Sequence, residues 1–400
     1  MALTPPPLAL YAHFPWCVRK CPYCDFNSHA LQGELPVDAY LQALFDDLDA
    51  QLPAALDRPL LSVFLGGGTP SLFPPAAIAR LLEGVRGRLR LDTGAEITLE
   101  ANPGTIERGR FAEYRAAGVN RVSLGAQSFG AVQLERLGRI HSADETRHAA
   151  EELHAAGLAN FNLDLMVGLP GQDPAGALSD VREALALRPA HLSHYQLTLE
   201  PGTVFGGLPP PDLPEADAAA DMQSACHGLL ESAGFQQYEV SAWARAGARC
   251  THNLNYWNFG DYLGIGAGAH GKLTSAAGRV ERTQREREPR RYLARGARGP
   301  AVSWVVRAAE LPFEFMMNAL RLADGFPLGL YEERTGLPWA AVAARVDGLS
   351  ERGLVEIRDG RCRATPLGWR FLNECLLAFM DLPRESRRKT GQKTPESSRA

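Results

Sequence analysis

The sequence predicts an α/β protein: a partial parallel (β/α)6 TIM-like barrel followed by a small C-terminal winged-helix-like α+β module. Two observations indicate the barrel. Short apolar runs alternate with amphipathic helical segments six times before residue 200, as parallel strands joined by crossover helices do. Polar residues then accumulate where these runs end, as expected at a barrel rim that binds ligands. The module is indicated by short helical segments after residue 305 and by an Asp-Gly pair at 359–360, which predicts a two-strand turn.

The strands are expected in runs rich in Val, Leu and Ile, as in strands buried on both faces. The clearest helix is PVDAYLQALFDDLDAQL, in which Leu41, Leu44 and Leu48 recur at steps of three and four and form one apolar face. The expected strands are 8–14, 60–68, 96–102, 121–129, 160–170 and 191–200, and further helices are expected near 75–90, 106–117, 143–156 and 174–188.

Composition divides the chain into four segments. Residues 1–235 form the barrel core and carry a cysteine-rich loop at 13–29. Residues 236–304 form a connector that contains HNLNYW, GAGAHG and an arginine-rich segment. Residues 305–382 form the C-terminal module. The tail 383–400 has almost no apolar residues and is expected to be disordered, because it cannot bury enough surface to fold.

Overall composition excludes several classes of protein. Apolar residues make up 45% of the 400 residues and charged residues 22%, which is ordinary for a soluble enzyme with a large core. The net charge of −4 gives no general attraction to nucleic acid or anionic lipid. No apolar run approaches the roughly 20 residues of a membrane span. The seven cysteines do not form a disulfide framework, so the expected location is the reducing cytoplasm.

Three closely spaced cysteines, Cys17, Cys21 and Cys24, predict a metal centre. A structural zinc site needs a fourth ligand, which His13 or His29 could supply, so a Cys3His zinc site stays open. A cubane iron–sulfur cluster held by three cysteines would instead leave one iron free to bind another ligand. The aromatic neighbours that would shield such a cluster are Phe14, Trp16, Tyr23 and Phe26.

The 3-then-2 spacing of these cysteines resembles that of the radical S-adenosylmethionine (SAM) enzymes. Further segments, in order, resemble the oxygen-independent coproporphyrinogen III oxidase superfamily: YxHFPWC, CPYCDFNSH, FLGGGTPS, LEANPG, GAQSF, LDLMVGLPGQ, LEPGT, HNLNYW and GIGAGAHG. The resemblance covers residues 8 to about 380. It implies a [4Fe-4S] cluster whose open iron binds SAM, and a reduced cluster that can cleave SAM to a deoxyadenosyl radical.

The same resemblance implies roles for single residues. Cys17, Cys21 and Cys24 would be the cluster ligands. Glycines at the end of the second strand would let the backbone approach the methionine end of SAM without a Cβ in the way. Carboxylates would bind the ribose hydroxyls and the amino group, and an arginine would pair with the SAM carboxylate. The implied SAM contacts are Tyr11, Gly67, Gly68, Thr69, Glu100, Gln127, Arg139 and Asp164.

One departure separates this chain from the oxidases proper. Those proteins carry a fourth cysteine two positions beyond the third, where this chain has Phe26. The chain also lacks their longer N-terminal arm, since Tyr11 comes almost at once. Both differences favour the heme-chaperone branch of the superfamily, whose members bind heme and deliver it to hemoproteins, over coproporphyrinogen decarboxylation.

A heme site needs an apolar cleft, an axial ligand and cations for the propionates. His252 in HNLNYW is the candidate axial ligand, but a histidine packed in a loop is an equally open interpretation; Cys250 is a second, less favoured ligand. His270 could face the SAM adenine or the substrate cavity. The eight arginines between 279 and 298 could pair with the propionates or form a solvated face.

The expected partners are heme and a hemoprotein acceptor, for which a respiratory protein is one candidate. A homodimer stays open. A third function, radical SAM modification of RNA, is suggested by the winged-helix-like module. The eight basic and ten acidic residues between 309 and 380 argue against it, so no nucleic acid partner is expected.

Overall fold

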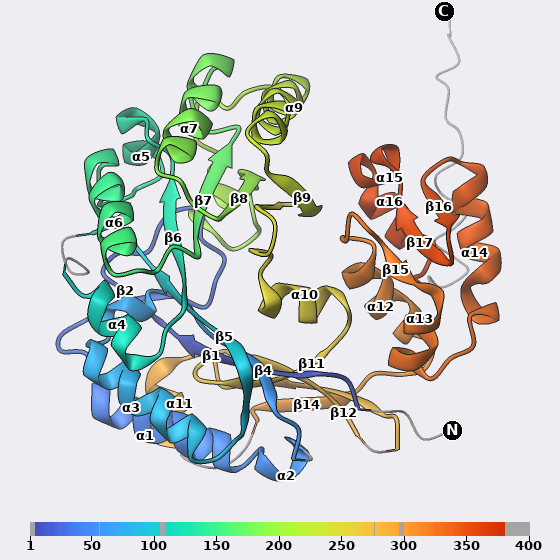
Figure 1. The fold of residues 1–400 in the computed structure, drawn as a ribbon, viewed down its shortest axis with the longest axis horizontal. Coiled ribbons are helices and arrows are strands. Elements are labelled where there is room, and N and C mark those ends of the chain that lie inside the picture. Colours follow the sequence, from blue (N-terminus) through green and yellow to red (C-terminus); the bar gives the residue numbers. More distant parts are fainter. Residues whose placement is uncertain (1–4, 56, 105–108, 276, 296–299, 381–400) are drawn as a thin grey trace, which may run out of the picture.

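The computed structural model describes residues 5–55, 57–104, 109–275, 277–295 and 300–380. These residues form one large twisted sheet with helices on its outer side and a separate C-terminal module (Figure 1). The tail that we expected to be disordered, 383–400, lies outside the described residues, as does Arg298 of the arginine-rich segment.

Twelve strands form the large sheet within the described residues, in the order β14-β13-β12-β11-β1-β4-β5-β6-β7-β8-β10-β9. The seven neighbours from β11 to β8 are parallel, and the strands at both ends pair antiparallel. The bounds are β1 Leu8–Phe14, β4 Leu60–Gly67, β5 Leu91–Ala101, β6 Arg121–Gln127, β7 Phe161–Val167, β8 His191–Gln196, β9 Gln236–Glu239, β10 Ala242–Ala244, β11 Asp261–Ile265, β12 His270–Thr274, β13 Val280–Gln284 and β14 Val302–Val305.

Helices connect the parallel strands and cover the outside of the sheet (Figure 1). Their first turns follow local rules: Ser142 and Glu145 form a capping box before α6, and Asp173 caps α7 by accepting from the Gly176 N–H. The bounds are α1 Val37–Asp49, α2 Leu52–Ala55, η1 Pro70–Leu72, α3 Pro75–Arg86, α4 Phe111–Ala117, α5 Ala131–Arg136, α6 Ala143–Ala155, α7 Pro174–Ala186, α8 Val204–Gly207, α9 Ala216–Ser232, α10 Thr251–Trp257 and α11 Pro289–Arg295.

The predicted α/β class, with a partial parallel barrel, is confirmed, because the sheet curves without closing. The structure adds strands that the sequence did not reveal. β11 is a seventh parallel strand beside β1, and β9 and β10 extend the opposite edge. All of them come from residues 236–305, so this segment completes both sides of the sheet.

The C-terminal module has its own apolar core, built around Phe315, Phe326 and Tyr331. Helices pack on a three-stranded sheet in the order β15-β17-β16. The expected turn is present, since Asp359 and Gly360 both adopt positive φ between β16 and β17. The bounds are α12 Leu311–Ala319, β15 Phe326–Pro327, α13 Leu328–Thr335, α14 Ala340–Glu351, β16 Val355–Arg358, β17 Arg361–Ala364, α15 Pro366–Arg370 and α16 Leu372–Leu377.

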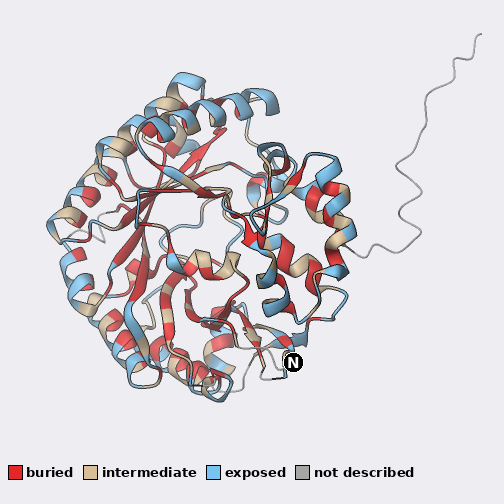
Figure 2. Cartoon of the chain, turned by 45° about the vertical axis from the view of Figure 1, so that its right-hand side comes forward, coloured by how far each residue is buried: buried red, intermediate tan, exposed pale blue. Residues whose placement is uncertain are grey.

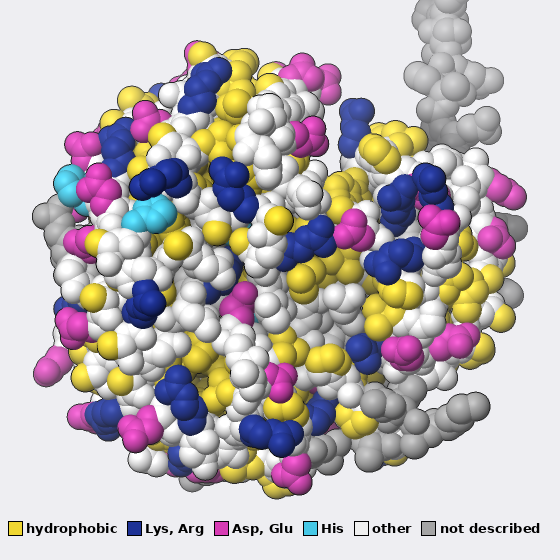
Figure 3. Space-filling model, viewed as in Figure 1, with side chains coloured by type: hydrophobic (Ala, Val, Ile, Leu, Met, Phe, Trp, Pro, Cys, Tyr) yellow, Lys and Arg dark blue, Asp and Glu magenta, His cyan; other side chains and the backbone are white. Residues whose placement is uncertain are grey.

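Strands and the inner faces of the helices are buried, whereas the outer helix faces are exposed (Figure 2). Acidic and basic side chains are interspersed on the face shown in Figure 3. Among the helices of the described residues, none combines the length and the hydropathy needed to cross a bilayer.

A buried lysine joins the sheet to the module. Lys272 on β12 is 1% exposed, and its Nζ donates to the Asp261 carboxylate at 2.9 Å and to the Phe259 carbonyl at 3.0 Å. The same ammonium group lies 4.1 Å from the centre of the Phe259 ring, which belongs to the core of the module. Burial lowers the pKa of Lys272 to about 8, although Asp261 opposes this shift.

Replacing Lys272 with Met is expected to lower the free energy of unfolding by about 2 kcal/mol, because its charged hydrogen bonds to Asp261 and to the Phe259 carbonyl are lost, while Asp261 keeps its ion pair with Arg58. Denaturant titration followed by tryptophan fluorescence measures the change. Arg86→Met, at an exposed position on α3, is the matched control and should change stability by less than about 0.5 kcal/mol. Equal effects of the two substitutions would contradict the assigned role of Lys272.

Candidate cofactor site

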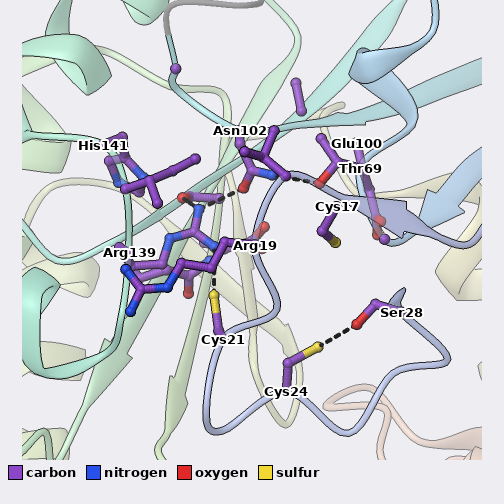
Figure 4. A pocket seen from close by; sticks show the side chains of 18 of the residues that line it. Cys17, Arg19, Cys21, Cys24, Ser28, Thr69, Glu100, Asn102, Arg139 and His141 are labelled. Atoms are coloured by element: carbon purple, nitrogen blue, oxygen red, sulfur yellow. Dashed lines mark hydrogen bonds between the residues drawn. The ribbon is translucent and has the colours of Figure 1, made fainter. Parts of the chain in front are cut away.

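The three clustered cysteines lie on the loop that follows β1. This loop is tied back at its base, where β2 (Trp16–Cys17) pairs with β3 (His29–Ala30). Its three thiols are free, partly exposed and line one cavity of about 300 Å³. Burial raises the pKa of the Cys17 thiol, while a hydrogen bond with Thr69 opposes this shift. The Cys24 thiol lies 3.5 Å from the Ser28 hydroxyl (Figure 4).

The glycine-rich end of β4 forms the wall beside the cysteine loop. A Cβ at Gly67 would lie 2.5 Å from the His13 ring, and one at Gly68 would lie 2.7 Å from the Trp16 carbonyl oxygen. The Thr69 N–H donates to the same carbonyl at 2.8 Å. These glycines are therefore required by the close approach of β4 to the chain's own cysteine loop, whereas we expected them to be required by the ligand alone.

Glu100, at the end of β5, presents a carboxylate to the cavity without a cationic partner among the described residues. Its Oε2 accepts the Gly67 N–H at 2.9 Å, which holds it beside the glycine segment. Loss of hydration raises the pKa of Glu100 to about 8, with a further increase from Asp164. A carboxyl group in this environment would be stabilised as the anion by a bound cation.

Asp164, at the centre of β7, is the second carboxylate of the cavity. Burial raises its pKa, and hydrogen bonds from Asn162, Ser193 and Ser123 oppose the shift. The Asn162 amide donates to it at 2.7 Å, and the Ser123 hydroxyl at 3.3 Å. One side of the carboxylate is therefore fixed by neighbouring strands while the other faces the cavity.

Gln127 reaches the cavity because β6 is irregular at its end. The pairing of β6 with β7 shifts register between Leu124 and Gln127, and Gln127 has a φ of 66°, which is rare for a residue with a side chain. Its Oε1 accepts from the Tyr195 hydroxyl at 3.0 Å. Non-glycine residues held in this conformation are concentrated at functional sites.

Arg139 lines the cavity, and its guanidinium lies beside the Cys21 sulfur (Figure 4). Its guanidinium donates to the Asn102 side chain at 2.5 Å, to the Gly125 carbonyl at 2.8 Å and to the Cys21 sulfur at 3.7 Å. Its Nε is buried with no partner in the described residues. The positive charge is therefore placed beside the thiols, with no carboxylate to neutralise it.

Asn102, His141 and Tyr195 are among the cavity residues that were missed from the sequence. Asn102 stands two positions after Glu100 in LEANPG, so its place at a strand end could have indicated it. Tyr195 lies inside the sixth predicted strand, where alternation with His194 could have indicated its direction. His141 carries no local signal. Burial, then the Arg139 charge, lower its pKa to about 3.

Tyr11 is the one expected SAM contact that does not line the cavity. Its hydroxyl donates to His13 Nδ1 at 3.0 Å, and its ring stacks on Phe64. His13 Nε2 donates to the Asn27 carbonyl at 2.9 Å. Both ring nitrogens of His13 are therefore engaged, which disfavours this residue as a fourth zinc ligand. Within the described residues no three His, Cys, Asp or Glu side chains converge on a site for a single ion.

The HNLNYW segment forms α10, which packs inside the sheet near the starting ends of the strands rather than at the cavity. Glu96 on β5 caps this helix: its carboxylate accepts the N–H groups of Thr251 and His252 at 3.0 Å each. Cys250 also lies against Glu96, and burial raises the pKa of its thiol to about 12. Cys250 is therefore not available as a thiolate ligand here.

His252 is 1% exposed and does not line the cavity. Its Nδ1 lies 2.9 Å from the Ser62 hydroxyl and its Nε2 lies 3.0 Å from the Tyr256 hydroxyl. Burial, then the charge of Arg121, lower its pKa to about 3, so the ring is neutral. Because both nitrogens are engaged, ligation of iron by His252 would require these two contacts to break.

The arginine-rich segment does not act as one surface. Arg285 is buried and pairs with Asp47 at 3.0 Å, and Arg282 pairs with Glu314 of the module. Arg290 and Arg291 are exposed on α11. His270, at the start of β12, is exposed and outside the cavity.

The high pKa of Glu100 predicts how the stability of the cofactor-free protein depends on pH. Folding raises the pKa from 4.5 to about 8, so the folded state binds an extra proton between these values. The contribution of Glu100 to the free energy of unfolding is largest below pH 4.5 and is lost as the pH rises towards 8. Thermal melts should therefore show a decline of Tm from pH 5 to pH 8 that is smaller in Glu100→Gln than in the wild type. Parallel curves for the two proteins would contradict the assignment.

Comparison with known proteins shows the family. Residues 11–184 match the radical SAM superfamily, and residues 306–371 match the HemN C-terminal domain. The heme chaperone HemW of Escherichia coli (strain K12) is 50% identical over 375 residues, which cover 94% of this chain and 98% of that protein. This chain belongs to the HemW family. HemW of Haemophilus influenzae is 48% identical over 94% of this chain and 98% of its own length.

A solved structure confirms the fold. Coproporphyrinogen III oxidase (HemN) from Escherichia coli, a radical SAM enzyme, superposes with a TM-score of 0.78 over 94% of this chain and 90% of that chain. The identity is 22%, so this likeness concerns the fold alone. The HemW relationship, by contrast, extends through the whole chain and confirms the family resemblance inferred from the motifs.

Proposed function

We propose that this protein is a heme-binding chaperone that holds a [4Fe-4S] cluster and SAM and delivers heme to hemoproteins. The observation that supports it best is the arrangement of the cavity. Three cysteines and seven of the eight expected SAM contacts come from six different strands or loops, yet they line one space of about 300 Å³. The relatives named heme chaperone HemW support the delivery of heme.

Cys17, Cys21 and Cys24 would hold the cluster through thiolates. The chemistry of this donor set fits, because soft thiolates bind iron–sulfur clusters and a cluster held by three of them keeps an iron free for SAM. Arg139, whose guanidinium contacts the Cys21 sulfur, would place a positive charge beside the cluster. When bound, the cluster and SAM would supply one-electron chemistry if SAM is cleaved, or SAM would serve as a structural ligand of the cluster if it is only bound.

The order of the side chains along the cavity also fits the order of the methionine and ribose parts of SAM. Glu100 is bonded to Gly67, so it lies at the end where the glycine segment would meet the methionine part. Its carboxylate would accept hydrogen bonds from the cationic amino group, and Arg139 would pair with the carboxylate of the same part. Gln127 and Asp164, on β6 and β7, would bind the ribose hydroxyls.

Hemin titration of the anaerobically reconstituted protein tests heme binding. We expect a saturable change of the Soret band, followed by loss of heme to an apo-hemoprotein added in excess. His252→Ala, titrated in parallel, tests the ligand implied by the family resemblance, because an unchanged spectrum rules that residue out. The absence of any saturable Soret change in the wild type would contradict the chaperone function.

Coproporphyrinogen oxidation is the alternative function, and the fold alone does not distinguish it from heme delivery. The position of the oxidases' extra cysteine is occupied by Phe26, whose side chain is exposed at the edge of the cavity. We therefore expect no protoporphyrinogen when the reconstituted protein is given coproporphyrinogen, SAM and dithionite. Formation of that product at a rate comparable to cluster reduction would place the chain among the oxidases.

A further inference from the structure

Large apolar side chains are exposed around the opening of the cofactor cavity. Val18, Phe26 and Ile140 are 45%, 60% and 58% exposed, and all three line the cavity. The first two belong to the cysteine loop and the third to the loop between α5 and α6. We call these three side chains the apolar mouth. Apolar groups gathered on a surface and rimmed by polar ones indicate a binding site.

The loops that carry the apolar mouth are held together by contacts, so its shape is defined. Pro22 of the cysteine loop packs so closely on Gly138 that a Cβ there would lie 2.9 Å from the Pro22 ring. On its other side the Pro22 carbonyl accepts the Phe205 N–H at 3.0 Å. This bond brings α8 alongside, with Val204 and Leu208 both more than half exposed. The cysteine loop is therefore held on one side by the α5–α6 loop and on the other by α8.

Cations lie directly beside the apolar mouth. Arg19 lines the cavity, and Lys20 follows it on the same exposed stretch of the cysteine loop. Within the described residues neither forms an ion pair, and Lys20 donates only to the Phe26 carbonyl at 3.3 Å. Asp25 is the one acidic side chain between Cys17 and Phe26. The carboxylate of Glu145, which also lines the cavity, is engaged with the Ser142 N–H at 2.8 Å.

We propose that the apolar mouth binds one face of the heme macrocycle, with Arg19 and Lys20 paired to its propionates. This inference rests on the proposed heme-chaperone function. It places the heme contact surface at the opening of the cavity, on the side that carries the cysteine loop. The cluster and SAM would lie deeper in the same cavity. A flat apolar ring with two carboxylates matches a surface that combines three exposed apolar side chains with two unpaired cations.

Hemin titration of the double variant Phe26→Ser/Ile140→Ser tests the apolar part. We expect the Kd for hemin to rise at least about tenfold, which corresponds to about 1.4 kcal/mol. Phe371→Ser, which removes a half-exposed phenylalanine from the C-terminal module, is the matched control and should leave the Kd unchanged. The circular dichroism spectrum and the Tm of the double variant should equal those of the wild type, which shows that the chain has folded.

A second pair of titrations tests the charged part. Arg19→Gln/Lys20→Gln should weaken binding of hemin by at least about tenfold, yet leave binding of hemin dimethyl ester unchanged, because the ester has no carboxylates to pair. If the wild type binds hemin saturably and both double variants retain its Kd within about twofold, the inference is overturned while the chaperone function stands. If the wild type itself shows no saturable binding, both fail.

Discussion

Replacing Cys24 with Ala is expected to abolish the iron–sulfur cluster. The structure places three thiols around one cavity, and a cluster held by two of them would expose a second iron to solvent and thiol exchange. Iron and acid-labile sulfide, measured after anaerobic reconstitution, should fall from about four of each per chain to less than about one. This is the largest effect that we expect from any single substitution.

The matched control is Cys226→Ala. Cys226 lies on the buried face of α9, and burial raises the pKa of its thiol to about 11, so it is neither accessible nor ionised at neutral pH. It should retain the wild-type iron and sulfide content. Tightly bound zinc in the wild type, with no sulfide, would contradict the cluster assignment and therefore the SAM site as well.

Glu100→Gln is expected to weaken SAM binding about 10- to 100-fold, because a buried charge-assisted hydrogen bond to the amino group is lost. It should also change the proton balance of binding. With a pKa of about 8, Glu100 is mostly protonated at pH 7 before SAM binds, and a bound cation would ionise it. Binding should therefore release close to one proton in the wild type and none from this group in the variant.

Isothermal titration at pH 7 measures this release when it is repeated in phosphate and in Tris, whose ionisation enthalpies differ. The slope of the observed enthalpy against the ionisation enthalpy gives the number of protons. Glu135→Gln, on the exposed face of α5, is the control and should keep the wild-type slope and affinity. A wild-type slope of zero would show that Glu100 is already ionised in the empty cavity.

The sequence predicted those parts of the fold that depend on local patterns. Buried strands and amphipathic helices repeat every 30 residues or so up to β8, and each carries its own apolar periodicity. β11 could not be predicted in this way, because it pairs with β1 about 250 residues earlier. Its five residues include Gly264, lie between Gly260 and Gly266, and show little alternation. The edge strands β9 and β10 are three or four residues long and give too short a signal.

The site was predictable for a different reason. The glycine segment, Glu100 and Gln127 stand at strand ends, and parallel strands bring their carboxyl ends to one rim whatever their separation in sequence. Asp164, at the centre of β7, and Arg139, on the loop between α5 and α6, do not follow this rule. The role of α10 was not predictable, because the group that caps it, Glu96, is more than 150 residues away and on another element. A histidine in a short motif looked like a ligand, and only the contacts with Ser62 and Tyr256 reveal its packing. From the sequence, Phe26 was notable as the position where the oxidases have a cysteine. In the structure its side chain is exposed and forms part of the apolar mouth.

The positions of α10 and of the apolar mouth have a consequence for the order of events. Because α10 packs against the start of β4 through the contact of His252 with Ser62, its residues do not line the cofactor cavity. If heme sits on the apolar mouth as proposed, it would cover SAM in the cavity beneath. SAM would then have to enter before heme binds, and its release would slow as the residence time of heme increases.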